Sequence, residues 1–215
     1  MRFRFIESIA PLASLVLVSL AVAGASVNTD LLDPATESPG LAVGDAVPDV
    51  ALVTPEGEEI DLSGLYADGP LVVTFYRGGW CPYCNIALKE WAGRFDDLTA
   101  AGGQFIAITP EKPEDAQTTI EKAEAGYRVF IDPDGEVGKA FRVQFEVDAE
   151  TRKAYKNYDI DLEKANVNGR WELPAPATFV IDTDGVIRWV HANWNYKADQ
   201  RAEPDAVIAA VRGLD

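Results

Sequence analysis

Residues 71–85 read LVVTFYRGGWCPYCN, and this stretch predicts the fold of the chain. Its first six residues, from Leu71 to Tyr76, form an unbroken apolar run that is typical of a strand buried on both faces of a sheet. Arg77 and two glycines follow this run. A helical pattern then begins near Cys81 and includes Cys84. The stretch therefore predicts a strand, a tight turn and two cysteines on the first turn of a helix.

Cys81 and Cys84 are the only two cysteines among the 215 residues, so any thiol chemistry must take place here. Side chains three residues apart on a helix lie about 5 to 6 Å apart at Cβ, close enough for a disulfide after a small adjustment. The helix N-terminus and nearby Arg77 favour a thiolate. We expect a redox-active pair. The alternatives are a structural disulfide, whose short loop would stabilise the fold little, and a metal site, although zinc needs about four ligands.

The first 25 residues have the composition of an export signal. Two arginines precede an apolar segment from Ile9 to Ala25, which ends in small residues before Ser26. We predict a signal peptide over residues 1–25 and an exported, periplasmic or extracytoplasmic protein. An uncleaved N-terminal membrane anchor is the alternative.

Residues 26–43 are rich in Asp, Thr, Ser and Pro, and we predict a flexible linker there. Residues 44–215 are one domain's worth of chain, long enough to bury a core. The formal net charge of the chain is −16. Because so acidic a surface repels nucleic acid and anionic lipid, we expect no nucleic-acid partner, and a membrane only if the N-terminal segment is uncleaved.

Strand and helix patterns alternate along this domain. Apolar residues at helical spacing predict a long helix that ends at Gly102-Gly103, and Pro204 predicts the start of a last helix. Further patterns predict strands at residues 47–52, 59–62, 71–76, 104–109 and 127–131, helices at 113–125 and 136–141, and a hairpin of strands 178–181 and 186–192. Residues 147–173 are polar and weakly periodic, and we expect them to leave the sheet and cover one face of the site. This order predicts an α/β fold with a central mixed sheet flanked by helices.

Three segments in order carry a family resemblance: Phe75 to Cys84, Trp171 to Asp182, and Arg201 to Pro204. On these residues the domain resembles the thioredoxin fold. More closely, it is similar to the alkyl hydroperoxide reductase/thiol-specific antioxidant (AhpC/TSA) family, in a peroxiredoxin-like subgroup with a CxxC motif. The resemblance covers nearly the whole domain and is more specific than a lone CxxC.

The resemblance also implies roles for individual residues. The family's active loop reads Pro-x-x-x-Thr-x-x-Cys, and its last cysteine is peroxidatic. Laid on this chain, it places Arg77 at the proline, Cys81 at the threonine and Cys84 at the peroxidatic cysteine. The arginine that family members carry three residues before a later phenylalanine, here Phe179, is replaced by Pro176. We expect Pro176 to be a thioredoxin-type cis-proline that faces the cysteine pair, and the alternative is an ordinary proline at the edge of a strand.

The function that the resemblance implies is that of an exported thiol peroxidase. The Cys84 thiolate would reduce a hydroperoxide, Cys81 would form a disulfide with it, and a thioredoxin-like donor would reduce the pair. Arg77 and Trp80 are the expected supporting residues, and no cofactor or metal is required. The first alternative is a thiol-disulfide oxidoreductase acting on protein disulfides, in which Cys81 attacks. A second is a copper-binding or copper-delivery protein that uses both thiolates and His191.

Overall fold

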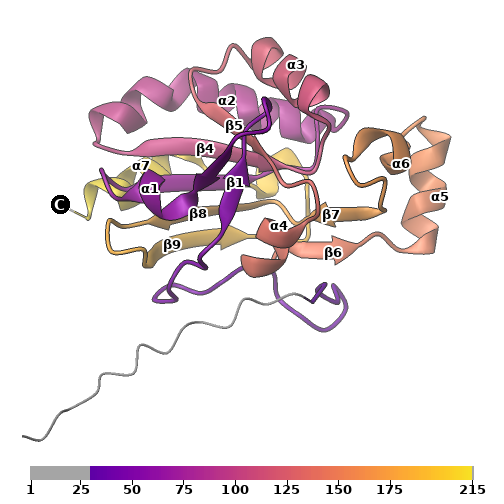
Figure 1. Cartoon of the computed structure of the whole chain (residues 1–215), viewed down its shortest axis with the longest axis horizontal. Coiled ribbons are helices and arrows are strands. Elements are labelled where there is room, and N and C mark those ends of the chain that lie inside the picture. The colour runs from indigo at the N-terminus through magenta and orange to yellow at the C-terminus, as the bar shows by residue number, and fades with distance from the viewer. Residues whose placement is uncertain (1–29, 215) are drawn as a thin grey trace, which may run out of the picture.

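The computed structural model describes residues 30–214, and the predicted signal peptide lies outside the described residues. A seven-stranded sheet with the order β2-β1-β5-β4-β3-β8-β9 runs through the domain (Figure 1). Its strands are β1 (Ala51–Val53), β2 (Glu59–Asp61), β3 (Leu71–Phe75), β4 (Gln104–Thr109), β5 (Arg128–Ile131), β8 (Ala177–Ile181) and β9 (Ile187–Ala192). Strand β4 is parallel to β3 and β5, while the other pairs are antiparallel. The predicted mixed sheet is confirmed.

Helices cover both faces of this sheet (Figure 1). One face packs against α2 (Pro82–Ala100), α3 (Pro113–Ala123) and α7 (Pro204–Arg212). The other face packs against α1 (Leu62–Tyr66) and α4 (Glu136–Ala140). A short 3-10 helix, η1 (Ala198–Gln200), precedes α7. The predicted α/β class with a sheet between helices is therefore confirmed.

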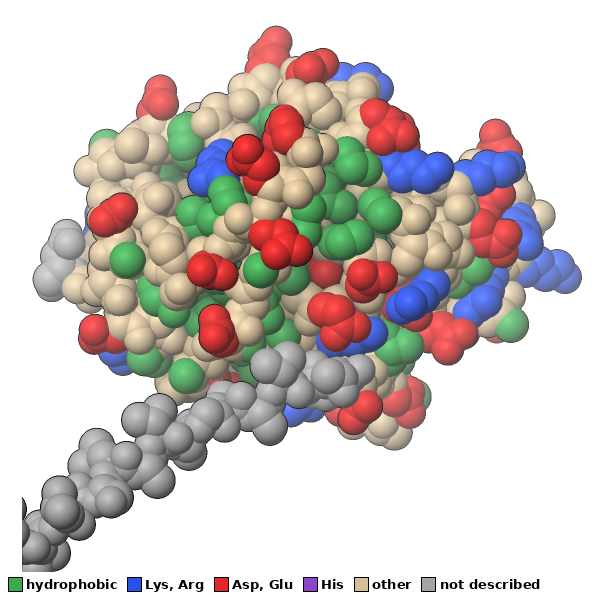
Figure 2. Space-filling view, in the orientation of Figure 1, with side chains coloured by type: hydrophobic (Ala, Val, Ile, Leu, Met, Phe, Trp, Pro, Cys, Tyr) green, Lys and Arg blue, Asp and Glu red, His purple; other side chains and the backbone are tan. Residues whose placement is uncertain are grey.

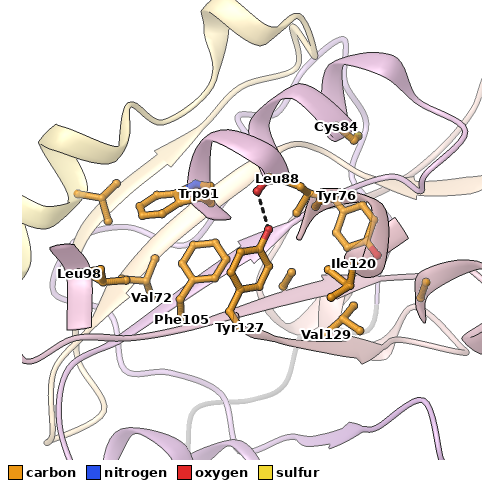
Figure 3. Close-up of a cluster of buried hydrophobic side chains, with 14 of the residues drawn as sticks. Val72, Tyr76, Cys84, Leu88, Trp91, Leu98, Phe105, Ile120, Tyr127 and Val129 are labelled. Atoms are coloured by element: carbon orange, nitrogen blue, oxygen red, sulfur yellow. Dashed lines mark hydrogen bonds between the residues drawn. The ribbon is translucent and has the colours of Figure 1, made fainter. Parts of the chain in front are cut away.

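The central strand β3 explains the apolar run at residues 71–76. All five residues of β3 are buried, and Val72 packs on the α2 face of the sheet while Val73 packs on the opposite face. Burial on both sides removes the polar alternation of a half-exposed strand. Figure 3 shows Cys84 at the start of α2, in the same core cluster as Val72 and Trp91. The second cysteine is therefore anchored in the core.

Residues 147–173 leave the sheet, as predicted, but they contain two helices that the sequence pattern did not predict. They carry α5 (Ala149–Asn157) and α6 (Leu162–Ala165), which project beside the short pair β6 (Gln144–Glu146) and β7 (Glu172–Pro174) (Figure 1). The Asp148 carboxylate caps α5 by accepting from the backbone N–H groups of Glu150 and Thr151, each at 2.9 Å. No residue of α5 is fully buried. The apolar periodicity that would have revealed this helix is therefore missing.

The described part of the predicted linker, residues 30–43, packs on the domain. Leu32 is buried, and its N–H donates to the Gln144 carbonyl at 2.9 Å. The indole N–H of Trp194 donates to the Glu37 carbonyl at 2.9 Å. Residues 30–43 therefore contact the domain through a buried apolar side chain and paired backbone groups, while their flexibility stays a prediction.

Acidic side chains are spread over the face shown in Figure 2, in keeping with the net charge of −16. On the same face, Lys and Arg side chains gather at the end formed by α5 and α6. Within residues 30–214, no helix combines the length and apolar character needed to cross a membrane.

Candidate active site

The cysteine pair lies where β3 passes through a short loop into α2. Cys81 is the N-cap of α2, and Pro82 occupies the first helical turn, where its fixed φ suits a helix start. The Cys81 carbonyl accepts from the N–H groups of Cys84 and Asn85 at 3.0 and 3.2 Å. Gly78 precedes the pair at φ +139°, a backbone conformation that favours glycine. The sequence thus fixes both sulfurs at the helix N-terminus.

Cys81 is the sulfur that faces the groove. Only 1% of its surface is exposed, yet it lines an open groove of about 720 Å³. The pKa of its thiol is lowered to about 5, first by the hydrogen bond from the Cys84 thiol and then by the positive charge of Arg77, which together outweigh burial. Cys81 is therefore a thiolate at neutral pH, the form that acts as a nucleophile.

Cys84 has the opposite character. Its side chain is fully buried in the core and does not line the groove. Burial, followed by the hydrogen bond to Cys81, raises the pKa of its thiol well above the usual value. Arg201 lies close, with Nη2 3.3 Å from the sulfur. Cys84 is thus a protonated thiol that lies in the core next to the Cys81 thiolate.

Arg77 is a buried cation that organises the groove. Nη2 donates to Cys81 Sγ at 3.1 Å, and Nη1 donates to the Tyr155 hydroxyl at 2.7 Å. Its guanidinium carbon also lies 3.8 Å from the ring centroid of Tyr196. A guanidinium held in this way keeps its charge and fixes its donors, so Arg77 stabilises the Cys81 thiolate directly.

Five aromatic side chains contribute to the groove wall. Trp80 packs edge-on against Tyr155, with ring centroids 5.6 Å apart, and Tyr83 packs against Tyr196 at 5.8 Å. Tyr158, on the segment after α5, lines the same groove. The expectation that residues 147–173 cover one face of the site therefore matches the position of Tyr155 and Tyr158.

The model of the AhpC/TSA family matches residues 43–190 of the chain. The chain belongs to the AhpC/TSA family. Peroxiredoxin Bcp from Escherichia coli (strain K12) is 28% identical over 150 residues, which cover 70% of this chain and 85% of that protein. A Mycobacterium tuberculosis (strain H37Rv) protein named as a candidate peroxiredoxin is 28% identical over 163 residues, covering 76% and 91% of the two chains. The family inferred from the three sequence segments is confirmed.

Solved structures show the same fold. Peroxidoxin BcpB from Mycobacterium tuberculosis superposes with a TM-score of 0.64 at 22% identity, covering 81% of this chain and 99% of that chain. A candidate thiol:disulfide interchange protein, DsbE from Chlorobium tepidum, superposes with a TM-score of 0.52 at 22% identity, covering 80% and 99%. At such identities the likeness establishes the thioredoxin-like fold alone.

In this AhpC/TSA protein, Pro176 does not adopt the expected conformation. Residues 30–214 contain no cis peptide bond, so the prediction of a cis-proline is wrong. The N–H of Ala175 donates to the Val143 carbonyl at 2.8 Å, and the Pro176 carbonyl accepts from Asn193 at 3.1 Å. Backbone pairing on both sides keeps this stretch extended. Pro176 lines a small cavity of about 20 Å³ rather than the groove at Cys81.

His191 does not join the sulfurs in a metal site. The ring Nε2 of His191 lies 2.9 Å from the Gln200 carbonyl, and the side chain lines the same small cavity as Arg201. Among the residues that the structure describes, no three His, Cys, Asp or Glu side chains cluster as metal ligands. The copper-binding alternative therefore has no ligand set to support it.

Sequence reasoning missed four residues of this AhpC/TSA site. Tyr155, Tyr196 and Arg201 reach the cysteines or Arg77 from segments far along the chain, and Glu111 lies behind the loop. The Glu111 carboxylate accepts from the Gly79 N–H at 2.7 Å, and burial raises its pKa to about 7. Of these four, only Arg201 could have been found from the sequence, because it belongs to a segment that carries the family resemblance.

Proposed function

We propose that this AhpC/TSA protein is a thiol-dependent peroxidase in which Cys81 is the nucleophile. The observation that carries the proposal is the groove-lining Cys81 sulfur, which accepts a hydrogen bond from Arg77 Nη2 at 3.1 Å. A thiolate with a lowered pKa and an approach path is the reactive form of cysteine in peroxide and disulfide chemistry. The named relatives support a hydroperoxide as the substrate.

The reaction runs in three steps. The Cys81 thiolate attacks the terminal oxygen of a hydroperoxide, so an S–O bond forms, the O–O bond breaks and an alcohol leaves as Cys81 becomes a sulfenic acid. The Cys84 thiol then attacks the Cys81 sulfur and releases water, which leaves a Cys81–Cys84 disulfide. A thioredoxin-type donor reduces this disulfide by thiol–disulfide exchange.

These roles reverse the assignment that the family's active loop implied. That assignment made Cys84 peroxidatic, but its raised pKa and full burial favour a resolving thiol. Cys81 stands at the threonine position of the loop, where a thiolate rather than a hydroxyl faces the groove. Cys84 can attack the oxidised Cys81 and form the disulfide because its thiol already contacts the Cys81 sulfur.

A peroxide-dependent turnover assay tests this function. Reduced protein is mixed with thioredoxin, thioredoxin reductase, NADPH and cumene hydroperoxide, and NADPH oxidation is followed. We expect turnover that requires the protein, together with a Cys81–Cys84 disulfide in peptide mass spectra after one equivalent of peroxide. Absence of oxidation of the cysteine pair by peroxide would refute the peroxidase.

A thiol-disulfide oxidoreductase is the second candidate. The low pKa of the groove-facing Cys81 and the groove volume of about 720 Å³ both suit a protein disulfide as substrate. Insulin reduction by the dithiol protein separates the two functions. If insulin is reduced rapidly while hydrogen peroxide and cumene hydroperoxide leave the pair reduced, the oxidoreductase replaces the peroxidase.

Export remains part of the proposal on the composition of residues 1–25. In an oxidising compartment, a close cysteine pair rests as a disulfide unless a dedicated donor reduces it. N-terminal sequencing of the protein from a cell fraction outside the cytoplasm is expected to begin at Ser26. A protein found only in the cytoplasm with an intact N-terminus would contradict export.

A further inference from the structure

Tyr155 is held beside the nucleophile because Arg77 contacts both residues. Nη1 of Arg77 donates to the Tyr155 hydroxyl oxygen at 2.7 Å, and Nη2 donates to Cys81 Sγ at 3.1 Å. The guanidinium is planar and its donors form a rigid fork, so it fixes the hydroxyl and the sulfur as neighbours. Both Tyr155 and Cys81 line the groove of about 720 Å³.

The direction of this hydrogen bond decides what Tyr155 can do. Arginine has donors and no acceptor, so the tyrosine oxygen accepts from Arg77 and the tyrosine proton is not used in that contact. The O–H group therefore remains available to a molecule in the groove. Burial raises the pKa of Tyr155, which keeps the proton in place at neutral pH.

The proposed reaction needs a proton at this place. Attack on an alkyl hydroperoxide expels an alkoxide, which is so strong a base that it must take up a proton at neutral pH. Proton transfer from a positioned side chain to such a leaving group accelerates a reaction by about 10²- to 10⁴-fold. Arg77 has no readily lost proton, and the buried Cys84 thiol faces the nucleophilic sulfur instead.

On the basis of the peroxidase proposed above, we infer that Tyr155 is the general acid that protonates the departing oxygen when Cys81 attacks a hydroperoxide. The Cys81 sulfur bonds to the terminal oxygen and the O–O electron pair leaves with the distal oxygen. The Tyr155 proton passes to that oxygen, giving an alcohol and a tyrosinate beside Arg77. Water from the open groove then returns a proton to Tyr155.

Two classes of oxidant test this role in the same protein. Tyr155→Phe and wild-type protein, both reduced, are mixed with cumene hydroperoxide and with peracetic acid in a stopped-flow instrument. Cumene hydroperoxide expels an alkoxide, whereas peracetic acid expels acetate, which needs no proton at neutral pH. We expect Tyr155→Phe to lower the rate with cumene hydroperoxide about 100-fold and the rate with peracetic acid less than about threefold.

The peracetic acid rate also reports whether the variant is folded, since a damaged site would lose both rates. Tyr66→Phe is the matched control, because Tyr66 packs on the opposite face of the sheet. Equal losses with both oxidants, or no loss with cumene hydroperoxide, would overturn the role of Tyr155. If wild-type protein reacts with neither oxidant, the peroxidase itself fails and this inference falls with it.

Discussion

Arg201 Nη2 lies 3.3 Å from the sulfur of Cys84, so each cysteine of the pair has its own arginine. Arg201 reaches this position from the end of η1, where the same Nη2 also donates to the Tyr196 carbonyl at 3.2 Å. Arg77 stabilises the Cys81 thiolate before the reaction with peroxide. Arg201 is placed to stabilise the Cys84 thiolate, which is the leaving group when a donor thiol attacks Cys81 of the disulfide.

Replacing Arg201 by Gln is therefore expected to slow reduction of the Cys81–Cys84 disulfide. A leaving thiol with a higher pKa departs more slowly, and we expect the rate of reduction by dithiothreitol to fall about tenfold. Arg188→Gln serves as the control, because Arg188 lies on β9 and pairs with Asp182 instead of a cysteine. An unchanged rate in the Arg201 variant would show that this contact does not assist the leaving group.

Replacing Arg77 by Met is expected to raise the pKa of Cys81. In wild-type protein we expect the rate of Cys81 alkylation by iodoacetamide to rise with pH and to level off above a midpoint at about 5. Without the Arg77 charge the midpoint moves to higher pH, and the rate at pH 6 falls several-fold. Arg128→Met on β5 is the control for loss of a remote arginine. A midpoint that stays near 5 would mean that the Cys84 hydrogen bond alone lowers the pKa.

The stability of the protein is expected to depend on the proton of Glu111. Burial raises its folded-state pKa to about 7 from an ordinary value of 4.5, so the neutral carboxyl is favoured in the folded protein. This stabilisation is complete below pH 4.5 and is lost as pH rises through 7. Glu111→Gln removes the cost of ionisation and keeps an oxygen that can accept from Gly79.

Urea unfolding at pH 4 and pH 8 measures this effect. We expect Glu111→Gln to exceed wild type in unfolding free energy by about 2 kcal/mol at pH 8 and to match it at pH 4. Glu90→Gln, at an exposed position on α2, should match wild type at both pH values. If Glu111→Gln were instead less stable than wild type at pH 8, the sign of the predicted change in unfolding free energy would be wrong.

The loop before Cys81 depends on the absence of a side chain at Gly79. A Cβ at this position would lie 1.9 Å from Thr119 Oγ1 and 3.3 Å from Glu111 Oε1. We expect Gly79→Ala to lower the free energy of unfolding by about 1 to 3 kcal/mol. The double variant Gly79→Ala/Thr119→Ala removes the clashing hydroxyl and should recover part of the loss. No recovery would place the cost in the backbone instead.

Much of the scaffold could be predicted because its elements carry strong local patterns. The buried run before the cysteines and the apolar stripe of α2 were both visible in the sequence. The strand predicted over residues 59–62 extends one residue too far, because Leu62 begins the short helix α1, which no pattern predicted. Helix α5 was not predicted from the sequence, because none of its residues is buried and its start is marked mainly by the Asp148 cap.

The opposite pKa shifts of the two cysteines, on which their proposed roles depend, could not be predicted from their spacing. The family's active loop pointed to Cys84 as the attacking residue. The opposite pKa shifts of the two thiols arise from full burial of Cys84, its hydrogen bond to Cys81 and the Arg77 charge. Arg77 and both thiols lie within eight residues of one another, but the burial of Cys84 depends on core residues from segments far apart in the chain, and no local pattern encodes it.

The most direct measurement compares the single-cysteine variants in a stopped-flow reaction with cumene hydroperoxide. Cys84→Ser retains the groove-facing thiolate and a hydroxyl donor beside it, whereas Cys81→Ser retains only the buried thiol. We predict that Cys84→Ser reacts rapidly and accumulates a sulfenic acid at Cys81, while Cys81→Ser reacts at least about 100-fold more slowly. Rapid reaction of Cys81→Ser with sulfenic acid formation at Cys84 would contradict Cys81 as the nucleophile.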